Sequence, residues 1–368
     1  MFWVILVINW IIQIRSASTQ TAQPLEGFSI QMFTCGSLFA GMGGLCRGME
    51  NAGFKTLWAN EFNKDCVKVY RKNFPETNLI AADINDISVS GNALEPVDVL
   101  HGGFPCQSFS GAGNRLGFED ERGMLFFEII RLIEEFGDKK PKVLVLENAP
   151  NLLIGDNGDW IERILTELQL SGYWFSMQNC LKIDAMKNCG LPQRRQRLFI
   201  IATSQDYFMD NPFEGEFDEV EMEKIQNFIN LDADLHDSYY LSKDNRFGSK
   251  LYEDLKDRPE YSLSHLRKTY ARPIEFGICP TLTANMGLGG HNVPFLLDNK
   301  GLRKLSEYEC LKLQGFSDDY KIPSFEEMPR TKIYTMIGNS VSPRVSTLIG
   351  NMVFSYLDRQ LNDNKLAV

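Results

Sequence analysis

One cysteine in this chain is presented in a way that suits nucleophilic chemistry. Cys106 lies in the run GGFPCQSFS, after two glycines and a proline, and the apolar segment Val97–His101 precedes that run. This pattern predicts a buried strand that ends in a backbone-restricted loop holding one thiol. A thiolate attacks electron-poor carbon well even when little of it is ionised. An isolated Pro-Cys pair is more often a structural cysteine in a tight turn. Other residues of the chain are therefore needed to decide whether Cys106 is a nucleophile.

A carboxylate and a run of arginines could assist such a thiol. Glu147 ends the apolar run Val143–Leu146, and QRRQR covers Gln193–Arg197. A half-buried carboxylate at the carboxyl edge of a sheet can keep its proton for acid catalysis, although it can also cap a neighbouring helix. An arginine run is by default a solvated surface. If a strand begins within it, however, alternate side chains point to opposite faces, and one arginine can reach a site.

A glycine turn and two acids indicate a nucleoside site. The first apolar run leads into FAGMGG, Phe39–Gly44, and Glu61 and Asp83 end later apolar runs. Glycines at a strand-to-helix turn let a ligand approach the backbone, and an acid after the second strand is where ribose hydroxyls are gripped. The glycine spacing is not GxGxxG, so no dinucleotide fingerprint is matched. Together the turn and the acids favour adenosine binding.

An α/β sheet is needed to position these residues. From Met32 the chain alternates apolar runs with helical patterns, which is typical of an α/β fold. Strands are predicted at Met32–Phe39, Lys55–Glu61, Asn78–Asp83, Val97–Leu100, Lys142–Glu147, near Tyr173–Leu181 and at Arg197–Thr203. Helices are predicted at Gly44–Asn51, at Asn63–Asn73 with Asn63 as N-cap, at Met124–Phe136 and from Val341 to Leu357; the α/β pattern resumes at Leu305–Leu313 after an interruption.

That interruption defines the expected domains. Residues 204–298 are polar, rich in aromatic and turn residues, and without sustained periodicity. We expect a sheet domain made of residues 32–203 plus 300–368, with a smaller irregular domain, residues 204–299, inserted into it. Residues 1–31 are expected to be a dispensable extension. Their apolar start is short for a bilayer span and lacks the basic residues of a signal peptide; a secretory leader is the alternative.

Charge and cysteine content restrict the class of protein. The formal net charge of −10 argues mildly against a nucleic-acid partner, yet Lys182–Arg197 is locally basic, and the placement of basic residues matters more than the total. The eight cysteines form no Cys-x-x-Cys pair, so neither a zinc site nor a disulfide framework is indicated. We therefore expect no metal and a cytoplasmic, nucleoid-associated protein.

The ordered motifs together resemble one family. The set FAGMGG, Glu61-Phe62, Asp83, GFPCQSFS, LEN, QRRQR, RKLSEYECLKLQGF and IGNSV is similar to the cytosine-5 DNA methyltransferases of bacterial restriction-modification systems, over nearly all of residues 33–352. The resemblance implies a Rossmann-like, S-adenosylmethionine-dependent methyltransferase sheet domain. It also implies a target-recognition domain inserted near the C-terminal end.

The resemblance assigns residues to the cofactor S-adenosylmethionine. Glu61 would hold the ribose, Phe62 would stack on adenine, and Asp83 would accept from the adenine amino group. The remaining cofactor residues would be Phe39, Gly41, Gly43, Ile84, Pro105, Asn339 and Val341.

The resemblance also implies the catalytic roles. Cys106 would attack C6 of cytosine, and Glu147 would hold N3 and the exocyclic amine and protonate N3. Arg197 would grip O2, with Arg195 assisting nearby. Because these ring atoms lie inside a duplex, the base has to be flipped out.

DNA contacts are expected from two segments. A mobile lid, Gln107–Arg122, would close over the base and contact DNA through Gln107, Ser110 and Arg122; Ala112 and Asn114 depart from the polar or basic residues common in the family. The run CPTLTANMGLGG resembles the family's recognition core, with Thr281 and Leu282 as its recurrent pair. Nearby polar candidates are Lys268, Arg272, His291 and Asn292.

Two other functions remain open at this point. One is a tRNA cytosine-5 methyltransferase, although the Cys-Phe-Thr stretch usual in that branch is not seen. The other is a catalytically silent DNA-binding protein, which the presence of Cys106, Glu147 and Arg197 disfavours. The expected partner is double-stranded DNA, with a monomeric enzyme, no membrane, and a cognate restriction endonuclease as an open possibility.

Overall fold

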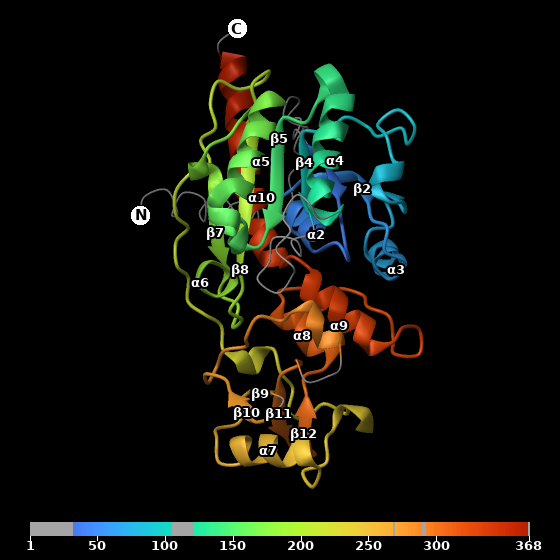
Figure 1. The fold of residues 1–368 in the computed structure, drawn as a ribbon, viewed down its shortest axis with the longest axis vertical. Coiled ribbons are helices and arrows are strands. Elements are labelled where there is room, and N and C mark those ends of the chain that lie inside the picture. The colour runs from blue at the N-terminus through green and yellow to red at the C-terminus, as the bar shows by residue number, and fades with distance from the viewer. Residues whose placement is uncertain (1–31, 105–120, 268, 289–291, 367–368) are drawn as a thin grey trace, which may run out of the picture. The chain divides into compact units, whose positions relative to one another are not determined.

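The fold is built on a mixed β-sheet that has helices on both faces (Figure 1). The computed structural model describes residues 32–104, 121–267, 269–288 and 292–366. Strands β1 to β5 run parallel, and β8 is antiparallel to β5, β6 and β7. The order is β3-β2-β1-β4-β5-β8-β6, with β7 paired to β8. The strands are β1 (Thr34–Leu38), β2 (Lys55–Asn60), β3 (Asn78–Ile80), β4 (Val99–Gly103), β5 (Val143–Asn148), β6 (Tyr173–Trp174), β7 (Cys180–Asp184) and β8 (Gln196–Ser204).

The central strand β5 is buried along its whole length, because both of its faces are covered by helices. Val145 belongs to a core cluster that includes residues of α2 and α10, whereas Leu146 belongs to a second cluster with residues of α4 and α5. Successive strand side chains point to opposite faces, so a continuous apolar run is what such a strand requires. The helices here are α2 (Gly44–Asn51), α3 (Lys64–Asn73), α4 (Glu121–Phe136), α5 (Asp159–Leu170), α6 (Ala185–Cys189), α8 (Glu307–Leu313), α9 (Arg330–Asn339) and α10 (Pro343–Leu366).

Most of the predicted elements agree with the structure, with several differences. Asn63 is confirmed as the N-cap of α3, since its side chain accepts the N–H groups of Asp65 and Cys66. Strand β3 ends at Ile80, so Asp83 lies beyond the strand instead of ending it. The strand predicted near Tyr173–Leu181 is two strands, β6 and β7, separated by a short 3-10 turn. Helices α5, α6 and α9 were not predicted, although the apolar residues of α5 and α9 have helical spacing. The predicted final helix, Val341–Leu357, begins at Pro343 and runs on to Leu366 as α10.

A second, smaller sheet occupies part of the stretch without periodicity. Its strands have the order β10-β9-β11-β12 and are antiparallel. A separate core cluster, including Leu251, Leu266 and Phe295, joins this sheet to α7. The strands have three or four residues each, too few for alternation to stand out in the sequence. The elements are α7 (Arg246–Leu255), β9 (Ser264–Leu266), β10 (Ala271–Pro273), β11 (Phe295–Asp298) and β12 (Gly301–Lys304), so the sheet runs past residue 299.

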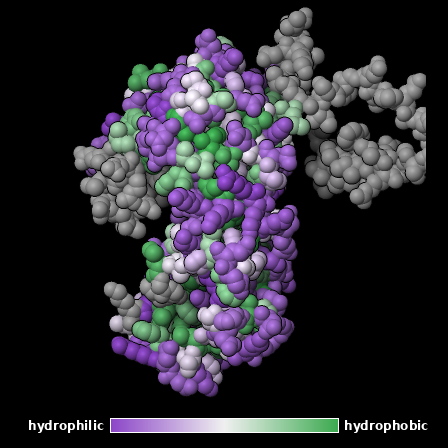
Figure 2. Space-filling view, turned by 90° about the vertical axis from the view of Figure 1, so that its right-hand side faces the viewer, coloured by the Kyte–Doolittle hydropathy of each residue, from purple (hydrophilic) through white to green (hydrophobic). Residues whose placement is uncertain are grey.

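Figure 2 shows the distribution of hydropathy on one side of the molecule. On the side of the molecule in Figure 2, hydrophilic residues predominate and hydrophobic ones occur in smaller groups. Among the described helices, none combines the length and the apolar character needed to cross a bilayer.

Candidate active site

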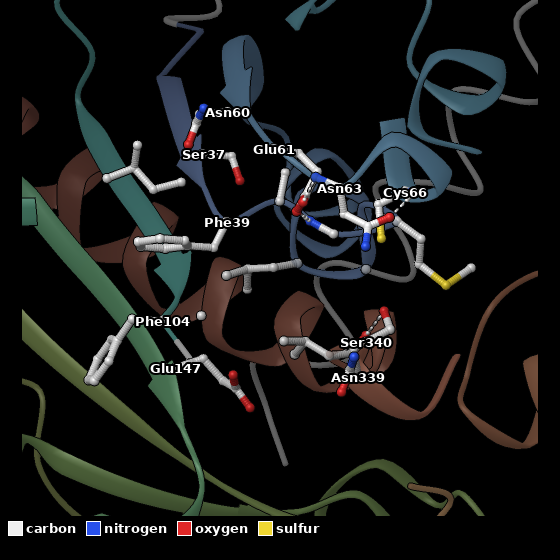
Figure 3. Close-up of a pocket in the computed structure, with 18 of the residues that line it drawn as sticks. Ser37, Phe39, Asn60, Glu61, Asn63, Cys66, Phe104, Glu147, Asn339 and Ser340 are labelled. Carbon is white, nitrogen blue, oxygen red and sulfur yellow. Dashed lines mark hydrogen bonds between the residues drawn. The ribbon is translucent and has the colours of Figure 1, made fainter. Parts of the chain in front are cut away.

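A cavity of about 630 Å³ lies at the carboxyl edge of the large sheet. Residues after β1, β2, β4 and β5 line it together with the C-terminal end of α9. Figure 3 shows Phe39, Glu61, Glu147 and Asn339 around this one space. The carboxyl edge of an open α/β sheet is where ligands bind in such folds. Residues far apart in the sequence therefore meet where the topology predicts a binding site.

The glycine turn after β1 forms one wall of the cavity. Phe39 and Gly41 line it and both have positive φ, 53° and 57°. Gly43 has φ 90° and precedes α2, and a Cβ there would lie 2.2 Å from the Phe74 ring. Of the two predicted cofactor glycines, Gly41 thus lines the ligand space. Gly43 instead permits the positive φ of the turn and the close approach of the Phe74 ring. The N-terminus of α2 adds donor groups of the kind that favour an anion.

Glu61 ties this turn to the next helix. Its Oε2 accepts the N–H of Gly41 at 2.7 Å, and its Oε1 accepts the N–H of Asn63 at 2.7 Å. The carboxyl group is almost fully buried, and this loss of solvation raises its pKa even though the two N–H groups favour the charged form. Each oxygen has lone-pair capacity left for a further donor, such as a ribose hydroxyl.

An exposed aromatic ring and a second acid complete this end of the cavity. Phe62 lines the cavity and is 66% exposed, which is unusual for phenylalanine. Asp83 also lines it and caps the 3-10 helix Ile84–Asp86 by accepting the N–H of Asn85 at 3.0 Å. The ring and the two carboxylates fit a nucleoside, because they supply a stacking face and acceptors for hydroxyl and amino groups. Sequence reasoning missed Asn60, whose Nδ2 donates to Ala82 O at 2.8 Å and fixes this arrangement.

At the other end of the cavity Glu147 is paired with Arg197. Glu147 is the penultimate residue of β5 and is 9% exposed, and its Oε1 lies 2.9 Å from Arg197 Nε on β8. Burial raises the pKa of Glu147, while the positive charges of Arg197 and Arg195 lower it; the net direction is upward. The site therefore combines an acid that holds its proton more readily than a solvated one with an adjacent guanidinium.

A glycine opposite Glu147 makes room for its carboxylate. Gly103 on β4 pairs with Glu147 on β5, and a Cβ at Gly103 would lie 2.8 Å from Glu147 Oε2. The sequence shows the Gly102-Gly103 pair, but it does not show that Glu147 is the side chain for which Gly103 leaves room.

Arg195, expected beside Arg197, has a different environment. Its side chain is 2% exposed and donates to Leu282 O at 2.7 Å, to Gly338 O at 3.0 Å and to Ser340 O at 2.7 Å. These contacts direct the guanidinium to backbone carbonyls. Its charge still acts on Glu147, as the pKa of that group reflects.

The remaining predicted cofactor residues lie as follows. Ile84 and Val341 line the cavity and are buried, and Asn339 lines it with an exposed side chain at the end of α9. Val341 O also contacts the start of α2, since a Cβ at Gly44 would lie 2.1 Å from it.

The predicted DNA contacts are placed only in part. Arg122 lies in the first turn of α4, and Arg272 lies exposed on β10. Thr281 is exposed, and its hydroxyl donates to Arg194 O. Leu282 is 1% exposed, so its side chain packs in the core and we no longer expect it to touch DNA. Asn292 donates to Asn285 O at 3.2 Å. The following predicted residues lie outside the described residues: Pro105, Cys106, Gln107, Ser110, Lys268 and His291.

Comparisons with known proteins agree with this geometry. The sequence profile of the C-5 cytosine-specific DNA methylases matches residues 33–355. The chain is 39% identical to the type II methyltransferase M.Bsp6I of Bacillus sp. (strain RFL6) over 326 residues, 88% of this chain and 99% of that one. It is 30% identical to M.HhaI of Haemophilus parahaemolyticus, over 87% of this chain and 94% of that one.

Solved structures support the fold alone. The Entamoeba histolytica methyltransferase EhMeth superposes with a TM-score of 0.68 at 18% identity, covering 89% of this chain and 99% of that one. A putative DNA modification methyltransferase encoded within an Escherichia coli prophage superposes with a TM-score of 0.64 at 21% identity, covering 89% of this chain and 99% of that one. The Rossmann-like arrangement of the large sheet is therefore shared with methyltransferases.

Proposed function

The chain belongs to the C-5 cytosine-specific DNA methylase family and is a DNA cytosine-5-methyltransferase of the type II class, and we propose that it acts on a flipped cytosine through a covalent bond between Cys106 and C6. The observation that carries this proposal is the Glu147–Arg197 pair. It lies in the same cavity as Glu61, Phe62 and Asp83. One space can thus take a pyrimidine at one end and a nucleoside-containing methyl donor at the other.

The residues at the Glu61 end fit S-adenosylmethionine. Glu61 would hold the ribose, Phe62 would stack on adenine, and Asp83 would accept from the adenine amino group; Phe39, Gly41, Ile84, Asn339 and Val341 would shape the remaining contacts. Gly43 would act indirectly by permitting the turn, and Pro105 would contribute from the segment before Cys106. When bound, S-adenosylmethionine supplies a methyl group on a positively charged sulfur.

Cys106, Glu147 and Arg197 would make C5 of cytosine reactive. The ring carbon C5 is by itself a poor nucleophile. In the proposed step the Cys106 thiolate forms a bond to C6, the C5–C6 π pair moves between C4 and C5, the C4–N3 π pair moves onto N3, and Glu147 gives N3 a proton. Arg197 holds O2, and its charge offsets the negative charge left on Glu147. After C5 is methylated, N3 returns its proton to Glu147. A base then removes the C5 proton, and that electron pair restores the C5–C6 double bond as the Cys106 thiolate leaves.

Access to C6 requires the base to leave the stacked duplex, so we propose base flipping. Gln107, Ser110 and Arg122 would contact the DNA beside the flipped base. Thr281, Arg272 and their neighbours in residues 204–299 would contribute to target recognition, which makes that region the recognition domain and residues 32–203 plus 300–368 the catalytic domain.

The proposed setting is a restriction-modification system. Methylation would protect DNA from a separate cognate endonuclease, and the enzyme would act as a monomer in the cytoplasm, associated with the nucleoid. Residues 1–31 would be dispensable for this activity.

Expression in a host free of cytosine methylation tests the function. Mapping of 5-methylcytosine across that genome should give one consensus sequence. A folded protein that binds S-adenosylhomocysteine but leaves the genome unmodified would contradict the proposal.

A second experiment tests the covalent step. The wild-type protein should be trapped on duplex DNA that carries 5-fluorocytosine in the mapped sequence, and Cys106→Ser should not. Trapping that persists in the variant would move the nucleophile to another residue.

A further inference from the structure

The segment between the small sheet and the active site is held by backbone and side-chain contacts to the QRRQR run. We call residues 279–287 the linking segment. Gln193 forms a β-bridge with Cys279, and Arg194 N–H donates to Cys279 O at 2.9 Å. Gln193 Oε1 accepts the N–H of Leu282 at 3.2 Å. The linking segment is therefore fixed to the residues that lead into β8 and Arg197.

Helix α9 packs directly on the same segment. A Cβ at Gly338 would lie 2.1 Å from the carbonyl carbon of Thr283, so the two backbones are in close contact there. Thr335 Oγ1 donates to Ala284 O at 3.3 Å. The C-terminal end of α9 lines the cavity through Gly338, Asn339 and Ser340. One face of α9 thus meets the linking segment while its last residues form a wall of the cavity.

Arg195 joins these two parts with one buried side chain. Its Nη1 bonds to the carbonyl of Leu282 in the linking segment, and its Nη2 bonds to the carbonyls of Gly338 and Ser340 on either side of Asn339. Gln314 Nε2 donates to Ser340 O as well, at 2.6 Å. A planar guanidinium can bridge separated acceptors in a fixed geometry, which the point charge of a lysine cannot do.

We propose that Arg195 is a positioning residue that couples the linking segment of the recognition region to the cavity wall at Gly338–Ser340. Placement of DNA by the recognition region would then act on the wall that carries Asn339, through Arg195. This role replaces direct assistance to Arg197 at the reacting base. The kinetic part of the proposal rests on the proposed function, whereas the structural part does not.

Arg195→Lys separates positioning from electrostatic assistance, since it keeps the positive charge and loses the planar fork. Arg194→Lys is the matched control, because Arg194 is the adjacent arginine with a largely exposed side chain paired with Glu275. We expect hydrogen exchange at the linking segment and at residues 330–340 to become about tenfold faster or more in Arg195→Lys only. The KM values for duplex DNA with the mapped sequence and for S-adenosylmethionine should rise together, by about tenfold to a hundredfold. The pH profile should keep its position.

Two results would overturn the proposal. One is an Arg195→Lys protein that matches Arg194→Lys in exchange and in both KM values. The other is a displaced pH profile without faster exchange, which would indicate an electrostatic role. If the wild type binds S-adenosylhomocysteine but methylates no DNA, the proposed function is wrong. The hydrogen-exchange rates of Arg195→Lys and Arg194→Lys still test the structural role of Arg195 in that case.

Gln193→Met keeps the test available if Arg195→Lys does not fold. It removes the amide that accepts Leu282 N–H and that also donates to Leu313 O and Gln314 Oε1, and it leaves Arg195 in place. Exchange should rise in the linking segment, while residues 338–340 stay protected. An equal rise in both segments would show that residues 338–340 are held through Gln193 and Gln314 and not by Arg195.

Discussion

Arg197 Nε lies 2.9 Å from Glu147 Oε1, across the antiparallel pairing of β8 with β5. The register places Glu147 opposite Phe199, two residues beyond Arg197. The pair thus places an acid, whose pKa is raised by burial, beside a cation. When Glu147 is ionised, the charge of Arg197 compensates part of the negative charge of the carboxylate. An acid that must be neutral in one step and charged in the next benefits from both influences.

Glu147→Gln should lose methylation while keeping its fold. Glutamine matches the shape of the carboxyl group but cannot give N3 a proton. We expect the single-turnover methylation rate to fall by about 10²- to 10⁴-fold, the usual contribution of general acid catalysis. Binding of S-adenosylhomocysteine, measured by calorimetry, should stay close to wild type. A rate within tenfold of wild type would remove Glu147 from proton transfer.

The same substitution should stabilise the protein in a pH-dependent way. The pKa of Glu147 is higher in the folded state than in the unfolded chain. Its contribution to stability is therefore present below the unfolded pKa and is lost as the pH rises through the folded pKa. Glu147→Gln should then have the higher Tm at about pH 8, and its advantage should shrink toward about pH 4. An advantage that grew on acidification would contradict the upward shift. Thermal unfolding followed by circular dichroism at both pH values measures it.

Gly103→Ala should displace the Glu147 carboxylate. The new Cβ would lie 2.8 Å from Glu147 Oε2, closer than side chains tolerate, and the flexible end of Glu147 would have to move. Misplacement of about 1 Å can cost on the order of a hundredfold in rate. We expect such a loss in single-turnover methylation, with S-adenosylhomocysteine affinity preserved because Glu61 and Phe62 lie at the other end of the cavity. Loss of that affinity instead would point to a wider rearrangement.

Phe62→Ala should weaken cofactor binding without affecting stability. The ring is 66% exposed, so its removal leaves little buried space unfilled. Loss of base stacking is worth about 1–3 kcal/mol, or roughly tenfold to a hundredfold in Kd. Calorimetry with S-adenosylhomocysteine measures the effect. Tyr308→Ala, at an exposed aromatic residue of α8, is the control and should bind as wild type does. Equal affinities in the two variants would exclude stacking by Phe62.

The sequence predicted the positions of the elements well where a local signal was strong. The apolar run of β5 and the Asn63 cap are examples, because burial on both faces and capping each leave a signature within a few residues. The strands of the small sheet are too short to leave such a signature in the sequence. Helix α9 did leave one, since Ile333, Met336 and Ile337 are spaced as on one helix face.

Sequence alone determined the family, the α/β class and the residue types available for catalysis, because the order and spacing of the motifs are properties of the chain itself. Only the tertiary structure decided what neighbouring residues of one motif do. Arg195 and Arg197 are two residues apart, yet one bonds to carbonyls 87 to 145 residues away and the other faces Glu147. Likewise Gly41 faces the cavity and Gly43 the Phe74 ring. The partners of a buried polar group are set by packing between distant segments, which no local pattern encodes.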